Sequence, residues 1–217
     1  MQNTLSRSIG FGLHSEIPPS ELIDVCKRVE EKGFTETWVS EDCFFRGGTT
    51  TAAIALQATS KLKVGIGILS AVTRHPAITA MEISTLAGAF PQRIQVGFGT
   101  GLPFWMQQMG LKKKSPLGAL RETLGSVRRL LNGETLTESN DNFEFDHIAI
   151  RYPAPDVPLY TGVIGPKALK LSGEIADGTI ISVNAGPKYI EKARDIIKTG
   201  QEISGRNIDH QLPTYVL

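Results

Sequence analysis

Two hydrophobic patterns alternate along this chain: short runs rich in β-branched residues, and longer runs in which apolar residues recur every three or four positions. The first pattern is typical of buried strands and the second of amphipathic helices. Their alternation therefore predicts an α/β fold in which βα units surround a parallel sheet. Seven strands are expected, at residues 9–13, 35–40, 63–68, 93–98, 158–161, 178–182 and 212–217.

The limits of several helices can be read directly from the sequence. After the fourth expected strand, Ser115 is placed to cap a helix that carries a stripe of leucines and ends at Gly133. Pro76, Pro166 and Pro187 are each placed to open another helix, because proline fits the first helical turn. The same order of strand, loop and capped helix therefore repeats along the chain.

Residues 134–155 break this rhythm. They have no helical stripe; instead Phe143, Phe145 and His147 alternate with Glu144 and Asp146. Such alternation predicts a small β-hairpin inserted into the α/β pattern. No linker or change in composition divides residues 1–217, so we expect a single domain.

Composition and charge narrow the classes of partner. With 41% apolar residues the chain can bury a core, and 23 basic against 22 acidic residues leave no field that would attract nucleic acid or an acidic membrane. No apolar run approaches the roughly 20 residues of a membrane span, and no secretion signal is visible. We therefore expect a cytoplasmic protein whose partners include neither nucleic acid nor a membrane. Cys26 and Cys43 are interpreted as free thiols.

In a barrel of parallel strands the functional groups gather in the loops after the strands. Two such loops are rich in glycine and can present bare backbone N–H groups to an anionic or polar ligand. For the first loop, a tight turn explains the glycines equally well. The second loop also opens a helix, whose N-terminus favours an anion. The candidate binding residues are Gly97, Gly99, Thr100 and Gly101 in the first loop, and Gly162, Val163, Ile164, Gly165 and Pro166 in the second.

Three side chains at strand ends are candidates for acid–base work. Glu41 and Asp42 are adjacent after the second strand, where two close carboxylates could share a proton; the alternative is helix capping or loop structure. His14 follows the first strand and could act as an acid or base near neutral pH, or serve only as a hydrogen-bonded structural residue. His75 precedes Pro76 and is expected to cap that helix.

The absence of other motifs narrows the chemistry. The four histidines have no spacing typical of a metal site, no lysine ends a strand, and there is no G-x-S-x-G motif. We therefore expect no catalytic metal. Glycine loops with few acid–base groups favour a bound organic cofactor that carries the reaction.

Five stretches, in this order and spacing, resemble the bacterial luciferase-like superfamily of flavin- and deazaflavin-dependent oxidoreductases. The resemblance covers roughly residues 8–217 and is greatest to the methylenetetrahydromethanopterin reductase branch. The stretches are Gly33-Phe34 with Trp38-Val39-Ser40-Glu41-Asp42, Lys61-Leu62-Lys63-Val64-Gly65-Ile66-Gly67, Arg74-His75-Pro76-Ala77, Val96-Gly97-Phe98-Gly99-Thr100-Gly101, and Gly165-Pro166 followed by Leu171-Ser172-Gly173-Glu174-Ile175-Ala176-Asp177-Gly178.

This resemblance implies a (β/α)8 TIM barrel that binds coenzyme F420, a 5-deazaflavin, or alternatively FMN, with the ring at the strand ends. It also implies a β-bulge at the end of the third strand, formed here by Gly67, Ile68, Leu69 and Ser70, with a non-prolyl cis peptide at Gly67–Ile68. The two glycine loops match the positions that hold the phosphate and side chain of the cofactor.

The sequence also departs from the family. His14 stands where the reductase branch tends to carry a glutamate, which leaves the proton donor open among His14, Glu41 and Asp42. Leu102 replaces a glutamate of the sugar-phosphate dehydrogenases, so a sugar phosphate is not the expected substrate. The resemblance implies hydride transfer between the cofactor and a small organic substrate. The alternatives are an FMN-dependent monooxygenase and, in a different class, a non-catalytic flavin-binding or scaffold protein.

The length of the chain bears on how the barrel closes. A complete barrel of this kind needs about 250 residues or more, whereas this sequence has 217 and ends inside the seventh expected strand. We therefore expect residues 1–217 to be one barrel domain, truncated at its C-terminus. An open side would expose strand edges and apolar helix faces, so we expect either a longer natural chain or a homodimer that closes the gap.

Overall fold

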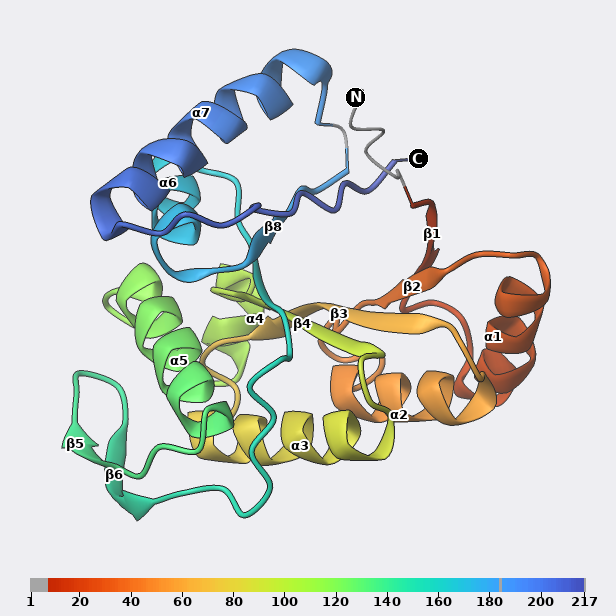
Figure 1. Ribbon diagram of the computed structural model, residues 1–217, viewed down its shortest axis with the longest axis horizontal. Coiled ribbons are helices and arrows are strands. Elements are labelled where there is room, and N and C mark those ends of the chain that lie inside the picture. The colour runs from red at the N-terminus through yellow and green to blue at the C-terminus, as the bar shows by residue number, and fades with distance from the viewer. Residues whose placement is uncertain (1–7, 184, 217) are drawn as a thin grey trace.

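The fold is a curved parallel sheet with helices along its outer side (Figure 1). The computed structural model describes residues 8–183 and 185–216. Six strands pair in parallel in the order β1-β2-β3-β4-β7-β8. They are β1 (Gly10–Leu13), β2 (Glu36–Val39), β3 (Lys63–Ser70), β4 (Ile94–Gly99), β7 (Leu159–Gly162) and β8 (Gly178–Ile180). The expected incomplete α/β barrel is confirmed.

The helices follow the outside of the curve from α1 to α7 (Figure 1). Because they cover the outer face, the central strand β4 is buried along its whole length. The helices are α1 (Leu22–Glu31), α2 (Gly48–Ala58), α3 (Pro76–Ala89), α4 (Pro103–Gln108), α5 (Pro116–Leu131), α6 (Pro166–Ile175) and α7 (Pro187–Ser204), with a 3-10 turn η1 (Pro19–Glu21) before α1.

The helix starts that the sequence predicts at Ser115 and His75 are confirmed. Ser115 caps α5 by accepting a hydrogen bond from the Gly118 N–H, and His75 caps α3 through its Nδ1 atom, which accepts from the Ala77 N–H. Each cap satisfies an N–H group that has no partner within its own helix. These caps fix where α3 and α5 begin, beside the ends of strands β3 and β4.

The expected seventh strand is replaced by a shorter, irregular pairing. Only Gln211 and Thr214 form bridges, both parallel, with Gly178 and Ile181 next to or within β8. Pro213 lies between them, and its missing N–H group prevents a regular ladder. The prediction of a strand at 212–217 is therefore wrong in extent, although the segment does continue the sheet at this edge. Leu217 lies outside the described residues.

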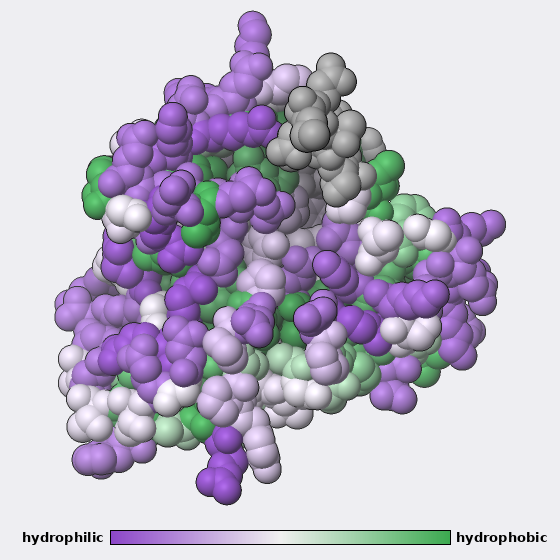
Figure 2. Space-filling view, in the orientation of Figure 1, coloured by the Kyte–Doolittle hydropathy of each residue, from purple (hydrophilic) through white to green (hydrophobic). Residues whose placement is uncertain are grey.

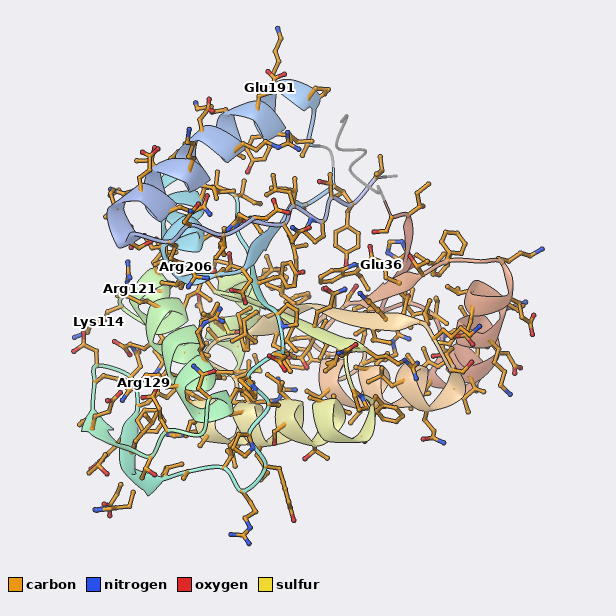
Figure 3. All side chains as sticks on the ribbon, in the orientation of Figure 1. Glu36, Lys114, Arg121, Arg129, Glu191 and Arg206 are labelled. Atoms are coloured by element: carbon orange, nitrogen blue, oxygen red, sulfur yellow. The ribbon has the colours of Figure 1, made fainter. Side chains whose placement is uncertain are left out.

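A two-stranded antiparallel sheet, β5 (Leu136–Ser139) and β6 (Glu144–Ile148), confirms the inserted hairpin. Arg129 of α5 pairs with Glu134 and Glu138 and so ties the hairpin to the barrel (Figure 3). On its other side, the His75 ring packs against Phe143 and Phe145 at centroid distances of 5.5 and 4.9 Å. The hairpin is thus fixed against the start of α3 and the last turn of α5 without entering the sheet.

The hydrophobic core lies between the sheet and the outer helices and consists mainly of leucine, isoleucine and valine. Figure 2 shows a surface dominated by hydrophilic residues, with apolar residues confined to small patches on this face. Among residues 8–183 and 185–216, no helix has the length and apolar character needed to cross a membrane.

Candidate functional site

A cavity of about 520 Å³ opens at the carboxyl ends of strands β2, β3, β4, β7 and β8. This is the end of a parallel barrel at which loops converge. Eleven of the predicted site residues line it: Glu41, Asp42, Gly67, Ile68, Ser70, Thr100, Gly101, Gly162, Val163, Ile164 and Gly165. The two glycine loops and the second-strand carboxylates, far apart in the sequence, therefore share one cavity.

One wall of the cavity is an irregular stretch of β3. The register between β3 and β4 shifts between Ile66 and Leu69, and the Gly67–Ile68 peptide bond is cis. The family resemblance places a bulge and a cis bond at this position. Gly67, Ile68 and Ser70 line the cavity, while Leu69 points into the core with 1% of its surface exposed.

Gly97 and Gly99 lie against the side chain of Ile68. A Cβ atom on either residue, or on Gly162, would overlap with the Ile68 side chain. Neither Gly97 nor Gly99 lines the cavity, and both are buried in β4. In the structure these two glycines make room for the side chains of Ile68 and, at Gly97, also of Ile180. Their contact with a cofactor stays a prediction.

The remaining residues of the first loop do reach the cavity. Gly101 has φ +75°, a conformation that favours glycine, and a Cβ there would lie 2.7 Å from Ser70 Oγ and 2.8 Å from Met106 Sδ. The Ser70 hydroxyl in turn donates to Met106 Sδ at 3.4 Å. Thr100 and Gly101 therefore turn the chain tightly from β4 toward α4, which closes one side of the cavity.

The loop after β7 presents backbone to the opposite side of the cavity. Gly162, Val163, Ile164 and Gly165 line it, and Gly165 is the N-cap of α6, where it makes no side-chain cap. Nothing lies within 4 Å of a Cβ built on Gly165, so the space in front of the α6 N-terminus is open. Pro166 is the first residue of α6 and lies outside the cavity lining. A helix start of this kind favours an anion.

The two adjacent carboxylates differ in their surroundings. Glu41 is nearly buried, and its two oxygens accept hydrogen bonds from Arg74 Nη1 and Nη2 at 2.8 and 2.7 Å; Oε2 also accepts from the Gly48 N–H at 2.7 Å. The hydrogen bonds that Arg74 donates to Glu41 raise the pKa of the Arg74 guanidinium. Glu41 thus caps α2 and anchors the loop after β3, which matches the structural alternative for this residue.

Asp42 also lines the cavity and, within the described residues, forms no ion pair. One of its oxygens accepts a hydrogen bond from the Ser15 hydroxyl at 2.6 Å, which orients the carboxylate. His14 is exposed and lies outside the cavity lining; its carbonyl oxygen accepts a hydrogen bond from Arg46, which is 8% exposed and also bonds the Leu13 carbonyl. Of the three acid–base candidates, Asp42 is the one best placed for chemistry in the cavity.

Several lining residues were not predicted from the sequence. They include Cys43, Leu102, Trp105, Met106 and Tyr215. Trp105 and Met106 belong to α4, a six-residue helix too short to show a hydrophobic period. Tyr215 lies in the irregular segment beyond the last regular strand. The sequence predicts a strand over residues 212–217, so Tyr215 falls inside that strand, and a search of the loops after the strands does not find it.

Burial and nearby charges determine whether the Cys43 thiol and the Tyr215 phenol, which both line the cavity, are protonated. Burial, together with the negative charges of Glu41 and Asp42, raises the pKa of the Cys43 thiol. Burial and the charge of Asp42 raise the pKa of the Tyr215 phenol. Both side chains are therefore protonated at neutral pH. Within the described residues, no three His, Cys, Asp or Glu side chains gather as a metal site would require.

Comparison with known proteins gives consistent matches. The family described as luciferase-like monooxygenase matches residues 4–216. The chain is 32% identical over 190 residues to the 5,10-methylenetetrahydromethanopterin reductase of Methanolobus tindarius, covering 88% of this chain and 58% of that protein. It is 32% identical over 205 residues to the F420-dependent glucose-6-phosphate dehydrogenase of Nakamurella multipartita, covering 88% of this chain and 60% of that protein.

A solved structure agrees with these matches. The coenzyme F420 dependent tetrahydromethanopterin reductase from Methanopyrus kandleri superposes with a TM-score of 0.85 at 27% identity, covering 96% of this chain and 65% of that one. The chain therefore spans less than two thirds of the length of these relatives. Nearly all of this chain has a counterpart in proteins whose names refer to coenzyme F420.

Proposed function

The chain belongs to the luciferase-like monooxygenase family, and we propose that it is an oxidoreductase that transfers a hydride between coenzyme F420 and a small organic substrate. The observation that carries the proposal is the cavity itself, in which the β3 bulge, the α6 N-terminus and Asp42 face one another. Support also comes from the relatives, which include reductases and dehydrogenases named as F420-dependent.

The residues of the cavity fit a flat ring with a phosphorylated side chain. Ile68 and Gly67 offer an apolar wall, and the loop Gly162 to Gly165 leads to an open helix N-terminus with backbone donors for a phosphate. The Tyr215 hydroxyl is buried and has no hydrogen-bond partner within the described residues. An apolar wall, an anion site and an unused polar group are the features that such a cofactor needs.

The deazaflavin would supply a ring carbon that accepts or gives a hydride. The protein residues would transfer the proton, exclude water and hold the loops in place. Asp42, oriented by the Ser15 hydroxyl, would hold or move a proton at its carboxylate. Trp105 and Met106 of α4 would exclude water from the open side of the ring. Glu41, bound to Arg74, would keep the loops after β2 and β3 in place.

The substrate is proposed to be a small, non-phosphorylated organic compound. Leu102 lines the cavity and is 47% exposed at the position where the resemblance places a glutamate in sugar-phosphate dehydrogenases. Glu41 and Asp42 are the charged groups of the described lining, and both are acidic. An anionic substrate would meet repulsion on this side of the cavity.

A titration tests the proposal and separates the two cofactors. Purified protein is titrated with coenzyme F420 and, in parallel, with FMN, while the fluorescence of Trp105 in the cavity and Trp38 in the barrel interior is followed. The ring absorbs at about 420 nm in the deazaflavin and at about 450 nm in FMN. Saturable quenching by F420 and weaker quenching by FMN is expected. Tighter binding of FMN would favour the monooxygenase alternative, and binding of neither would favour the scaffold alternative.

A further inference from the structure

We propose that the Tyr215 hydroxyl donates a hydrogen bond to a carbonyl oxygen of the bound cofactor ring, and so fixes how deep the ring sits in the cavity. The inference rests on the proposed function, because it needs a ring bound against β3. The ligand chemistry is a planar ring with a carbonyl edge, which deazaflavins and flavins share. Tyr215 would then be a binding residue at the cofactor, contributed by the segment after α7.

The position of Tyr215 is set by the pairing of its own backbone. Its N–H donates to the Ile181 carbonyl at 3.0 Å, next to the parallel bridge between Thr214 and Ile181. From there the side chain reaches across the barrel. A Cβ on Gly67 would lie 3.0 Å from the Tyr215 hydroxyl oxygen, and a Cβ on Gly12 would lie 3.6 Å from its ring. The phenol therefore spans the space from β8 to β1 and the β3 bulge.

The environment of the ring differs from that of the hydroxyl group. The ring packs with Ile68 on the apolar cluster formed by Trp38, Tyr160 and Ile180. The hydroxyl oxygen is buried, yet no described residue forms a hydrogen bond with it. A buried hydroxyl without a partner is costly, and native proteins rarely leave one. Since Tyr215 also lines the cavity, a ligand in the cavity is the natural partner.

The phenol is suited to donate rather than accept. Burial and the nearby negative charge of Asp42 raise the pKa of Tyr215, so the proton stays on the oxygen at neutral pH. Gly67 has no side chain to separate the hydroxyl from whatever lies against the β3 bulge. A carbonyl at the edge of the ring supplies an acceptor where the protein supplies none.

A matched pair of variants tests the assignment. Tyr215→Phe removes only the hydroxyl, and Tyr160→Phe does the same to a tyrosine of the same apolar cluster that does not line the cavity. Dissociation constants for F420 and FMN are measured by quenching, and the melting temperature of each ligand-free variant is recorded. We expect Tyr215→Phe to weaken binding of the preferred ring about fivefold to tenfold, as loss of one hydrogen bond does. Its melting temperature should be unchanged or higher, because an unpaired buried hydroxyl is lost. Tyr160→Phe should bind as the wild type does.

The outcomes separate this inference from the proposed function. If wild-type protein binds the ring and Tyr215→Phe binds it equally well, the assignment of Tyr215 is wrong while the proposed function stands. The same conclusion follows if Tyr215→Phe lowers the melting temperature and binding together, since that is the mark of a structural hydroxyl. If wild-type protein binds neither ring, both the proposed function and this inference are overturned.

Discussion

Arg74 and Glu41 form a two-point ion pair, in which both terminal nitrogens of the guanidinium bond both oxygens of the carboxylate at 2.8 and 2.7 Å. The pair joins the end of β2 to the loop between β3 and α3, and the Gly48 N–H adds the start of α2 to the same carboxylate. Glu41 and its neighbour Asp42 are therefore chemically alike and structurally different. Each can be tested separately.

Substitution of Glu41 should mainly cost stability. The side chains of Arg74 and Glu41 are 24% and 10% exposed, so Glu41→Gln leaves a largely buried guanidinium with only the Glu82 carboxylate, 3.6 Å from its Nε, as counter-charge. We expect the free energy of unfolding to fall by about 2 kcal/mol. Urea denaturation followed by circular dichroism measures this change. A variant as stable as the wild type would show that the pair contributes nothing.

Asp42→Asn should lower the rate of the reaction and leave the stability of the fold unchanged. The amide can still accept a hydrogen bond from the Ser15 hydroxyl, so the fold should be as stable as that of the wild type within about 0.5 kcal/mol. The proton-transfer capacity of the carboxylate is lost, so we expect the rate of cofactor oxidation with a substrate to fall at least tenfold. An active Asp42→Asn variant would move the proton donor to another residue, and His14→Gln is the next variant to measure.

The glycines of the cavity should respond according to what surrounds them. Gly165→Val meets no neighbour within 4 Å, so the fold should persist while cofactor affinity falls about tenfold or more, because the backbone donors are covered. Lys112→Ala is the matched control: Lys112 is the exposed first residue of the run Lys112-Lys113-Lys114, outside the cavity lining. Equal losses in the two variants would mean that the lysines, rather than the loop backbone, hold the phosphate.

His210 should make stability depend on pH. Its Nε2 atom bonds Thr179 Oγ1 at 2.8 Å, and burial, with the positive charge of Arg206, lowers its pKa to about 4. In the unfolded chain the pKa returns to about 6.5, so between these values the unfolded state binds more protons. Stability from this residue is complete above about pH 6.5 and falls as the pH drops toward 4.

Melting temperatures measured from pH 4 to 7 check this prediction. His210→Gln should flatten the curve, whereas His147→Gln, which alters an exposed histidine of the hairpin, should leave its slope unchanged. If the two variants give the same slope as the wild type, the acidic loss of stability comes from other groups.

The two cysteines should differ in reactivity. Cys43 lines the cavity, and its raised pKa makes the reactive thiolate scarce near neutral pH. Iodoacetamide should therefore label Cys43 slowly at pH 7.5 and much faster above pH 9, and bound cofactor should slow the reaction. Cys26, which is 1% exposed, is the internal control and should stay unlabelled in the folded protein. Mass spectrometry of tryptic peptides distinguishes the two sites, and labelling unaffected by cofactor would place Cys43 outside the occupied space.

Exposed apolar residues at the two edges of the described sheet predict self-association. Ile9, before β1, is 75% exposed, and Val216, at the opposite edge of the described sheet, is 88% exposed. Strand edges flanked by apolar side chains tend to pair with another chain. We expect light scattering to give the mass of a homodimer, and Ile9→Lys to shift it toward the monomer. A stable, monodisperse monomer with a cooperative melt would contradict this expectation.

Much of the fold could be predicted from the sequence because the strands are short β-branched runs between legible helix caps. Helix α2 was missed because its threonines and alanines give little contrast between its faces, and six of its eleven residues are buried. The convergence of the loops on one cavity could be predicted, since strand ends meet at one edge of a parallel sheet. Which of their residues bind a cofactor stays a prediction. The roles of Gly97 and Gly99 could not be predicted, because they depend on where the Ile68 side chain packs.

The Ile68 side chain occupies the space next to Gly97, Gly99 and Gly162. The sizes of the side chains at these four positions, on three strands, therefore depend on one another. A larger residue at position 99 alone must displace Ile68 and with it the cavity wall. A smaller residue at position 68 would vacate the space that Gly99→Ala needs, so the double variant should recover folding that the single variant loses. Sequences that diverge from this one are thus free to change the shape of the ring-facing wall, but only by changing β3 together with β4 or β7. Any redesign of the cavity has to treat these positions as a set.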